Sequence, residues 1–251
     1  MIGDVTGKAV FVIGGTRGIG YAIAVRLVQG GALVGITGRS GDAAKTAAES
    51  IHKDDVWGYG LDVSDRDAIV EVIRRFDAER DGFDALVYSA GVSPTYTSGE
   101  KLDVADWDSI LSVNLTGAFV AATAFARHAI ERGRSGSIVL VGSIAGTAGA
   151  ARLTAYSASK AGLVGLAKSL ALDWARYGIR VNVLAPGWVE TDMTTGVRAS
   201  DSLSNWIKSR TPQGRMAKPE EIADMATFLV SASASFATGA VFTLDGGWTT
   251  G

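Results

Sequence analysis

Seven short segments rich in Val, Ile and Leu recur along the chain, separated by longer stretches in which apolar residues follow helical spacing. They are Ala9–Ile13, Leu33–Thr37, Val56–Leu61, Ala85–Ser89, Ser137–Val141, Arg180–Leu184 and Ala240–Leu244. Segments this continuously apolar are typical of strands buried on both faces. Because they alternate with helices, they predict an α/β domain built on a doubly wound parallel sheet of about seven strands, with helices on both faces.

A single domain accounts for the whole sequence, residues 1–251. Its length and its hydrophobic content of 47% suffice for one large core. The sequence contains no internal repeat, low-complexity tract or proline-rich linker that would divide it. Helical spacing extends over 107–132 and 155–177, whereas the polar segment Glu190–Arg215 interrupts the alternation of strands and helices. A segment of that length predicts either a substrate lid or disorder.

The charge balance indicates which partners to expect. The formal net charge is −2, from 24 Lys and Arg against 26 Asp and Glu, so the chain has no general attraction to nucleic acid or to an anionic membrane surface. We therefore expect small molecules and further copies of the chain as partners. The sequence has no cysteine and two histidines, which fall on separate expected helices, so we expect neither a disulfide nor a metal site.

The first residues, MIGDVTGKAVFVI, lack the basic stretch, long apolar centre and cleavage site of a secretory signal. By inspection, no apolar run approaches the ~18 residues that are needed to span a bilayer. These features predict a cytoplasmic protein.

The stretch VIGGTRGIG, residues 12–20, follows the first expected strand and opens a helix. Its glycines Gly14, Gly18 and Gly20 have the spacing G-x-x-x-G-x-G. A helix N-terminus offers unpaired N–H groups and a positive dipole end, and glycines let a pyrophosphate approach them closely. The stretch therefore predicts a dinucleotide-binding turn. The alternative is a tight turn that binds nothing.

Two arginines indicate the phosphorylated form of the cofactor. NAD-binding versions of this fold carry an acidic residue near the end of the second strand, whereas a 2′-phosphate needs arginine. Here that strand ends LVGITGRS, with Gly38 and Arg39 where the acid would stand, and Arg17 lies inside the glycine turn. We therefore predict NADP(H) rather than NAD. The alternative is that both arginines are solvated surface charges.

Tyr156 and Lys160 lie four residues apart in LTAYSASKAG, hence on one face of an expected helix. A nearby ammonium stabilises a phenolate, so we expect Lys160 to lower the pKa of Tyr156 and make it a usable general acid or base. Ser143 ends an expected strand and supplies a neutral hydroxyl for a carbonyl oxygen. Asn114 lies inside a helical pattern, where Asn is a mediocre helix former. It is a helix defect, an exposed polar residue or the holder of a water linked to Lys160.

Together these residues make the sequence similar to the short-chain dehydrogenase/reductase family over essentially the whole chain. The family's glycine motif matches residues 13–20, and its catalytic Asn and Ser match Asn114 and Ser143. Its Tyr-x-x-x-Lys motif matches Tyr156 and Lys160. Its Asp-Val pair after the third strand and its Pro-Gly turn with a following Thr are matched by Asp62, Val63, Pro186, Gly187 and Thr191.

The resemblance implies a Rossmann-type fold and assigns roles to the matched residues. Tyr156 would transfer the proton, and Ser143 would hold the carbonyl oxygen. Lys160 would bind the nicotinamide ribose and tune Tyr156, and Asn114 would position a water of the proton relay. The implied reaction is reduction of a carbonyl to a secondary alcohol by hydride transfer, or the reverse. The residues that would bind NADP(H), with Val189 and Thr191 at the carboxamide, are Gly14, Thr16, Arg17, Gly18, Ile19, Gly20, Arg39, Asp62, Val63, Ser89, Ala90, Gly91, Tyr156, Lys160, Pro186, Gly187, Val189 and Thr191.

The sequence departs from the family pattern in two places. Ile13 stands where the family has Thr, and the usual Asn-Asn-Ala-Gly after the fourth strand reads YSAG, with Tyr88 and Ser89 in place of both asparagines. Those groups normally brace the central sheet and line the adenosine side of the cofactor, so local hydrogen bonding must differ here. Ala90 and Gly91 still permit close approach of the backbone to the cofactor.

Two substrate classes are open. Over its full length the sequence most commonly resembles 3-oxoacyl-thioester reductases. These enzymes dock an acidic acyl-carrier protein on a basic patch. The second candidate is a ketone or secondary-alcohol dehydrogenase acting on a free cyclic, aryl or steroid-like substrate. Candidates for the basic patch, which are alternatively scattered solvated charges, are Arg132, Arg134 and Arg176. Candidates for an apolar lid are Leu203, Trp206 and Ile207, and pocket residues are expected in Ser93–Ser98, Ile144–Thr147, Trp188–Met193 and Thr194–Arg210.

Other classes fit the sequence less well. A non-catalytic NADP-sensing regulator would keep the fold but has no need of the Asn, Ser, Tyr and Lys set. Epimerases and dehydratases of the extended branch have a different glycine spacing and a longer substrate region, and enoyl reductases separate their Tyr and Lys more widely. The family usually forms homotetramers, and the alanine-rich segments Ala118–Ala129 and Leu163–Ala175 permit close helix approach. An internal helix face is the alternative interpretation of those segments.

Overall fold

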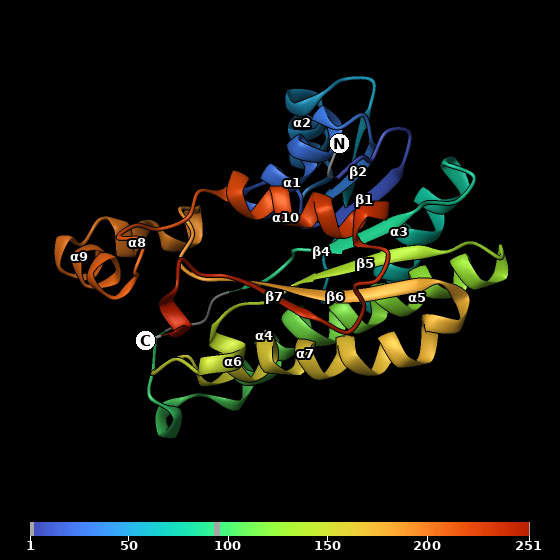
Figure 1. Ribbon diagram of the computed structural model, residues 1–251. Coiled ribbons are helices and arrows are strands. Elements are labelled where there is room, and N and C mark those ends of the chain that lie inside the picture. The colour runs from blue at the N-terminus through green and yellow to red at the C-terminus, as the bar shows by residue number, and fades with distance from the viewer. Residues whose placement is uncertain (1–2, 93–95, 251) are drawn as a thin grey trace.

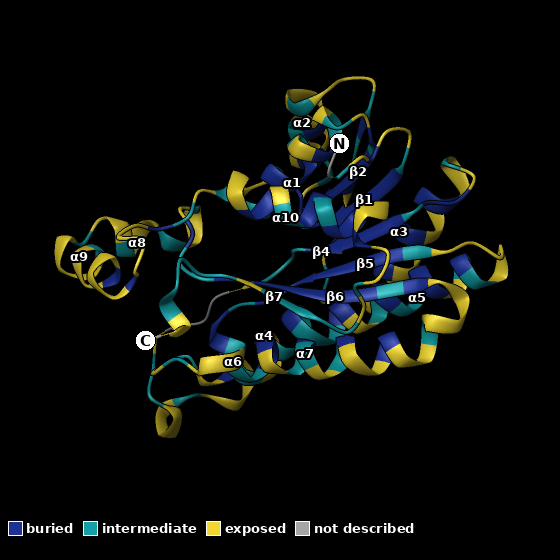
Figure 2. Ribbon diagram, viewed as in Figure 1, coloured by how far each residue is buried: buried dark blue, intermediate teal, exposed yellow. Residues whose placement is uncertain are grey.

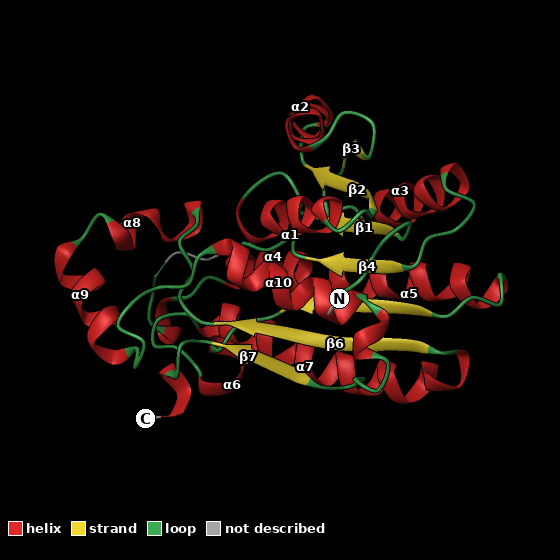
Figure 3. Ribbon diagram, turned by 45° about the horizontal axis from the view of Figure 1, so that its top comes forward, coloured by secondary structure: helices red, strands yellow, loops and turns green. Residues whose placement is uncertain are grey.

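The computed structural model describes residues 3–92 and 96–250. Its sheet is parallel throughout and has the strand order β3-β2-β1-β4-β5-β6-β7. In Figure 3 the arrows of the labelled strands point the same way. The predicted doubly wound sheet of seven strands is confirmed, and the strand ends differ from the expected ones by one or two residues. The strands are β1 (Ala9–Ile13), β2 (Leu33–Gly38), β3 (Val56–Gly60), β4 (Ala85–Tyr88), β5 (Gly136–Val141), β6 (Ile179–Pro186) and β7 (Val241–Leu244).

Helices cover both faces of the sheet (Figure 1). One face carries α1 (Gly18–Gln29), α2 (Gly41–Ile51) and α10 (Pro219–Val230). The other face carries α3 (Arg66–Glu79), α5 (Gly117–Glu131) and α7 (Thr154–Trp174). Two short helices, α4 (Val104–Leu111) and α6 (Ala145–Ala148), pack against α7. Two more, α8 (Thr195–Arg198) and α9 (Asp201–Arg210), project beyond the carboxyl ends of the strands.

Two apolar cores, one on each face, hold the layers together. The central strands are buried over their length, whereas α5 and α7 are buried only on the side that meets the sheet (Figure 2). On the face that carries α3, α5 and α7, five aromatic rings pack with centroids 4.7–6.1 Å apart: Phe11, Tyr59, Phe76, Phe83 and Phe125. Such ring pairs contribute about 0.5–1.5 kcal/mol each beyond the burial of their area. Burial on both faces explains why the strand segments are continuously apolar.

The helix expected over 107–132 is interrupted. α4 ends at Leu111, and Ser112–Thr116 form a π-helical turn before α5 begins. Asn114 lies in this turn and is fully buried. The helix defect expected at Asn114 is therefore present, and the interpretation of Asn114 as an exposed polar residue is wrong. Such π turns are rare and occur frequently at functional sites.

The whole helical run from Val104 to Glu131 is long and apolar enough to cross a membrane, judged by length and composition alone. The expectation that no segment reaches this length is therefore wrong. It rested on runs of consecutive apolar residues, whereas this helix mixes alanines with polar residues. Half of its most apolar window is buried inside the fold, where Ala118, Ala122 and Phe125 belong to the core.

The polar segment Glu190–Arg215 is ordered rather than disordered, and it holds α8 and α9. Ser200 caps α9 by accepting a hydrogen bond from the Leu203 backbone nitrogen at 3.5 Å. Ile207 is buried beneath the helix. The segment is hard to assign from sequence because most of its residues are polar and a single side chain anchors α9 in the interior.

The strand order reverses between β1 and β4. In doubly wound sheets, ligands bind in the crevice outside the carboxyl ends of the strands at such a reversal. The glycine turn follows β1, and residues 89–91 follow β4, so both flank this point. The topology therefore places the predicted cofactor-binding turn at the reversal.

Candidate active site

The glycine turn folds tightly against its neighbours at the carboxyl end of β1. Gly14 and Gly18 have φ values of +85° and +56°, which L side chains rarely adopt. A Cβ on Gly20 would collide with the Gly14 carbonyl oxygen, and a Cβ on Gly14 would lie 2.6 Å from the Ala90 backbone nitrogen. The turn thus requires its glycines, and it packs directly against the segment that follows β4.

Among the described residues, no N-cap side chain caps the N-terminus of α1. Within the described residues, Arg17 at the N-cap makes no capping hydrogen bond, and the first turn of α1 holds no acidic residue. Ser40, Asp65 and Asp103, by contrast, cap α2, α3 and α4. Unpaired N–H groups and a positive dipole end suit an anion. A dinucleotide pyrophosphate fits this cradle, and residues 14–20 would hold it.

Arg17 and Arg39 are both exposed at this end of the sheet. A Cβ on Gly38 would collide with Thr16, so the end of β2 lies against the glycine turn and Arg39 follows directly after it. Hydrogen bonds from Ser64, and then the charge of Arg39, lower the pKa of Asp62, which follows β3. Both arginines therefore lie at the end of the sheet that carries the glycine turn.

Tyr156 and Lys160 lie one turn apart at the start of α7. The Lys160 Nζ atom is 5.6 Å from the centroid of the Tyr156 ring and donates a hydrogen bond to the Val141 carbonyl at 2.8 Å. Lys160 is only 5% exposed, and burial lowers its pKa to about 8. The ammonium is therefore held at the end of β5, beside the tyrosine ring.

Burial raises the pKa of Tyr156, and a hydrogen bond with Ser143 opposes that shift. The expectation that Lys160 lowers the Tyr156 pKa is therefore wrong for this structure. Desolvation is the largest cause of the raised Tyr156 pKa, and the Lys160 ammonium is not among the causes; it donates to the Val141 carbonyl instead. Tyr156 is consequently neutral near pH 7, which suits it to donate a proton.

Ser143 and Asn114 complete the predicted set of four. Ser143 follows β5, and its Oγ accepts a hydrogen bond from the Ala145 backbone nitrogen at 3.1 Å. Asn114 donates through Nδ2 to the Val92 carbonyl and to Ser159 Oγ, both at 3.1 Å. Its Oδ1 accepts from the Val92 nitrogen at 2.9 Å. Asn114 thus ties the segment after β4 to α7, and its role toward a water stays a prediction.

The segment Ser89–Gly91 lies between the glycine turn and the catalytic set. The Ser89 nitrogen donates to the Ile13 carbonyl at 2.9 Å. A Cβ on Gly91 would lie 3.5 Å from Asn114 Oδ1 and 3.6 Å from Lys160 Nζ. The backbone after β4 therefore connects the expected cofactor and catalytic residues.

The segment after β6 closes the other side of the crevice. Pro186 ends β6 and accepts a hydrogen bond from the Ile144 nitrogen at 3.0 Å, and Val189 is buried. A Cβ on Gly187 would lie 2.8 Å from the Asp245 Cα, and a Cβ on Gly18 would lie 3.5 Å from Thr191 Cγ2. The last contact brings the expected carboxamide-binding segment against the glycine turn.

Two further residues of the expected cofactor set lie on neighbouring elements. Ile19 lies in the first turn of α1, and Val63 lies beside α5.

Several residues that shape the site are not singled out by any sequence motif. Thr37 is buried and accepts hydrogen bonds from Gly14 N, through Oγ1, and from Gly15 N, through its carbonyl, both at 3.0 Å. One sequence feature could have identified Thr37: it is the one polar side chain in the strand LVGITG. Val92 and Val141 act through backbone groups, which leave no trace in side-chain identity.

The α8–α9 segment, residues 195–210, contacts the chain's last turn through aromatic rings. The Trp206 and Trp248 centroids are 5.3 Å apart, and Trp188 lies 6.2 Å from Trp248. The Arg210 guanidinium lies 5.6 Å and 5.0 Å from the Trp206 and Trp248 rings. Of the three predicted apolar lid residues, Ile207 is buried, whereas Leu203 and Trp206 are about half exposed.

The expected substrate pocket is described in part. Of Ser93–Ser98, residues 93–95 lie outside the described residues. Tyr96 is 53% exposed and adds to the raised pKa of Tyr156, so it lies near that hydroxyl. The Thr97 nitrogen donates to the Arg152 carbonyl at 3.2 Å, which joins this segment to the loop before α7. The segment therefore lies beside Tyr156.

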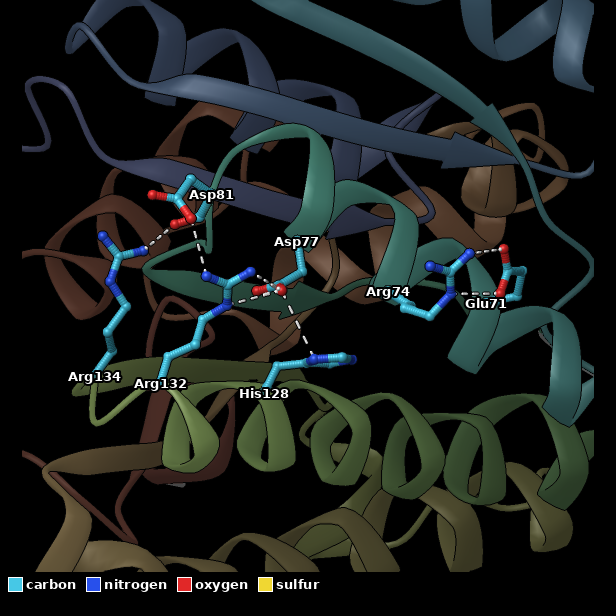
Figure 4. Close-up of polar contacts among 7 residues, drawn as sticks. All are labelled: Glu71, Arg74, Asp77, Asp81, His128, Arg132 and Arg134. Carbon is cyan, nitrogen blue, oxygen red and sulfur yellow. Dashed lines mark hydrogen bonds and ion pairs between the residues drawn. The ribbon is translucent and has the colours of Figure 1, made fainter.

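Of the three arginines of the predicted basic patch, Arg132 and Arg134 precede β5 and Arg176 precedes β6, at the end of the sheet opposite Ser143. Figure 4 shows Arg132 between two carboxylates, with NH2 2.9 Å from Asp77 and NH1 3.0 Å from Asp81. Arg134 donates to the Asp81 carbonyl at 2.8 Å. Arg176 lies 4.7 Å above the Tyr177 ring. The charge of Arg132 is therefore neutralised within the chain, which weakens the patch as a docking surface.

Known proteins resemble this chain over nearly its full length. A family model described as enoyl-(acyl carrier protein) reductase matches residues 13–249. The chain is 39% identical over 244 residues to the 3-oxoacyl-[acyl-carrier-protein] reductase FabG of Aquifex aeolicus (strain VF5), covering 96% of this chain and 97% of that protein. It is 37% identical over 245 residues to the cis-4-hydroxycyclohexanecarboxylate dehydrogenase of Sinomonas cyclohexanicum, covering 96% of each.

A solved structure agrees over the full length. The crystal structure of a gluconate 5-dehydrogenase from Burkholderia cenocepacia J2315, in complex with NADP and tartrate, superposes with a TM-score of 0.95 at 32% identity. The match covers 100% of this chain and 98% of that one. These proteins differ in the substrates that their names state, while they share one fold with this chain.

Proposed function

Because this chain belongs to the short-chain dehydrogenase/reductase family, we propose that it is an NADP(H)-dependent enzyme that reduces a carbonyl to a secondary alcohol, or catalyses the reverse. The family match and the relatives support oxidoreduction at a CH–OH/C=O centre. The observation that carries the proposal is the half-buried Tyr156, whose hydroxyl interacts with Ser143 and which lies one turn from Lys160. It stands at the same end of the sheet as the open N-terminus of α1.

The side chains account for the proton and charge movements of such a reaction. When bound, NADPH supplies the hydride that reaches the carbonyl carbon. Tyr156 donates its hydroxyl proton to the carbonyl oxygen, because burial keeps the phenol neutral near pH 7. The Ser143 and Tyr156 hydroxyls stabilise the negative charge that develops on that oxygen. Lys160, whose pKa is about 8, supplies positive charge beside the phenolate that remains.

The cofactor preference rests on two charges. Arg17 and Arg39 stand at the glycine turn and after β2, where the 2′-phosphate of NADP would be recognised. The gluconate 5-dehydrogenase from Burkholderia cenocepacia was crystallised in complex with NADP. NADP(H) is therefore the cofactor that the site supports best, held by the uncapped end of α1.

The preferred substrate is a 3-oxoacyl thioester, on the strength of the 39% identity to the Aquifex reductase. A free hydroxy acid or cyclic alcohol is the second candidate. It is favoured by the half-exposed Trp206 ring on α9, which offers an apolar surface without a carrier protein, and by the names of the other two relatives. Since Arg132 is paired within the chain, a carrier protein would rely on Arg134 and Arg176.

The deciding experiment follows NADPH oxidation with an acetoacetyl thioester beside a matched panel of free cyclic, aryl and sugar-acid ketones. A kcat/KM that is highest for the thioester supports acyl-chain chemistry. A kcat/KM that is highest for a free ketone replaces it with the second candidate. Absence of turnover with every carbonyl, despite tight NADPH binding, would favour the non-catalytic regulator and contradict the proposed function.

We also propose a homotetramer, as is usual in this family. α5 and α7 present Phe119 and Leu172 to solvent, with exposures of 46% and 82%. The alanine-rich turns of the same helices allow close approach of a second copy.

A further inference from the structure

Tyr88 occupies a position where a tyrosine has no counterpart in the family motif. It ends β4, is 1% exposed, and ranks among the largest fully buried side chains of the described residues. Its hydroxyl donates a hydrogen bond to the Val113 carbonyl at 2.6 Å. Burial raises the pKa of Tyr88, so the hydroxyl remains a donor across the pH range in which enzymes work.

The accepting carbonyl belongs to the π turn. In a regular α-helix the Gly117 N–H would bond to the Val113 carbonyl four residues earlier. Here the Gly117 N–H bonds instead to the Ser112 carbonyl, five residues earlier. The Tyr88 hydroxyl therefore donates to the Val113 carbonyl in place of the Gly117 N–H. The hydrogen bond therefore satisfies a partly buried carbonyl at the point where the helix widens.

Gly117 is matched to this arrangement. A Cβ at position 117 would collide with the Tyr88 hydroxyl oxygen and would lie 3.1 Å from the Val63 carbonyl oxygen. Glycine here leaves the space that the phenol fills. The pair Tyr88 and Gly117 thus forms one fitted contact between β4 and the start of α5.

The π turn carries Asn114, whose side chain is fully engaged. It exchanges two hydrogen bonds with the backbone of Val92 and donates a third to Ser159 Oγ. Ser159 Oγ in turn donates to the Tyr156 carbonyl at 2.7 Å. A chain of hydrogen bonds therefore runs from the π turn to the helix that carries Tyr156.

We propose that Tyr88 is a positioning residue for the catalytic site: its hydroxyl fixes the π turn and so the placement of Asn114, and Gly117 makes room for it. The inference rests on the proposed function, because it takes Asn114 as part of a working site. It also accounts for the departure from the Asn-Asn-Ala-Gly pattern, since a tyrosine at the first position braces the helix opposite through its hydroxyl.

A double-mutant cycle tests this proposal. Tyr88→Phe removes only the hydroxyl and takes away the donor to the partly buried Val113 carbonyl, so kcat should fall about tenfold, with the substrate KM changed less than about twofold. Asn114→Ala should lower kcat as well. If Tyr88 acts through Asn114, adding Tyr88→Phe to Asn114→Ala should change kcat by less than about twofold. Multiplying losses in the double variant would overturn the proposal, as would an unchanged kcat in Tyr88→Phe.

Two further variants separate positioning from general stability. Tyr59→Phe is the matched control, because Tyr59 is also buried and its hydroxyl bonds to Glu79 away from the site; it should lower the unfolding midpoint and leave kcat unchanged. Gly117→Ala keeps the phenol but displaces its hydroxyl, so it should reproduce the loss of kcat and the coupling to Asn114 even if Tyr88→Phe is insoluble. If the wild-type protein turns over no carbonyl, the proposed function fails; if it is active but Asn114→Ala retains full kcat, or if Asn114→Ala is impaired while Tyr88→Phe and Gly117→Ala are not, only the positioning role fails.

Discussion

Replacing Lys160 by Met should change how the stability of the cofactor-free protein depends on pH. Lys160 is 5% exposed, and its pKa is about 8 in the folded chain against 10.5 for an ordinary lysine. Burying the ammonium at pH 7 therefore costs about 3 kcal/mol, since each pKa unit corresponds to about 1.4 kcal/mol. Met has a similar length and carries no charge, so the variant does not bear this cost.

The sign of the pH effect follows from proton binding. Between pH 8 and pH 10.5 the unfolded chain holds the Lys160 proton and the folded chain releases it, so the stability of the wild-type protein rises with pH in this window. The variant lacks that rise. From pH 7 to pH 10 the wild type should gain about 2 to 3 kcal/mol of unfolding free energy relative to Lys160→Met.

Urea unfolding of both proteins at pH 7, 8, 9 and 10, without cofactor, measures this difference. The lost hydrogen bond to the Val141 carbonyl shifts the variant by a constant amount and leaves the slope unchanged. Other titrating groups cancel in the difference between the two proteins. A difference in unfolding free energy that stays flat across this range would refute the reasoning, because it would mean that the buried ammonium keeps an ordinary pKa.

Three further outcomes are expected. Tyr156→Phe should fold and bind NADPH with wild-type affinity yet lose turnover by about 100-fold or more, because it removes the general acid; a variant with substantial turnover refutes the role. Arg39→Ser should raise the KM for NADPH about tenfold and leave that for NADH nearly unchanged, whereas equal effects on both cofactors, or equal wild-type constants, would contradict recognition of the 2′-phosphate. Light scattering of the purified protein should give the mass of four chains, and a monomer would contradict the proposed assembly.

Much of the fold could be predicted because its strands are buried on both faces. Because of that burial, each strand is a nearly continuous apolar run in the sequence. The seven runs predict the strand ends to within one or two residues. The glycine turn was predictable for a related reason. Gly14, Gly18 and Gly20 occupy positions where a Cβ would strain the backbone or approach a neighbouring segment, so their identity reflects the contact itself.

Other properties depend on contacts that the sequence does not state. The spacing of Tyr156 and Lys160 places both on one helix face, but it does not reveal that Lys160 bonds to the Val141 carbonyl or that burial raises the Tyr156 pKa. The π turn is hidden because its residues continue a helical pattern of apolar positions. The pairing of Arg132 is equally invisible, since its partners Asp77 and Asp81 are more than 50 residues away along the chain.

The cluster of Trp188, Trp206 and Trp248 gives the protein an optical reporter at its site. Indole rings with centroids 5.3 and 6.2 Å apart couple electronically, and Arg210 lies near two of them. Trp206 belongs to α9, whereas Trp188 follows β6 and Trp248 belongs to the last turn of the chain. Any displacement of α9 during substrate entry would separate the rings and alter near-ultraviolet circular dichroism and fluorescence. Movement of this segment can therefore be followed in the native protein, without an attached dye.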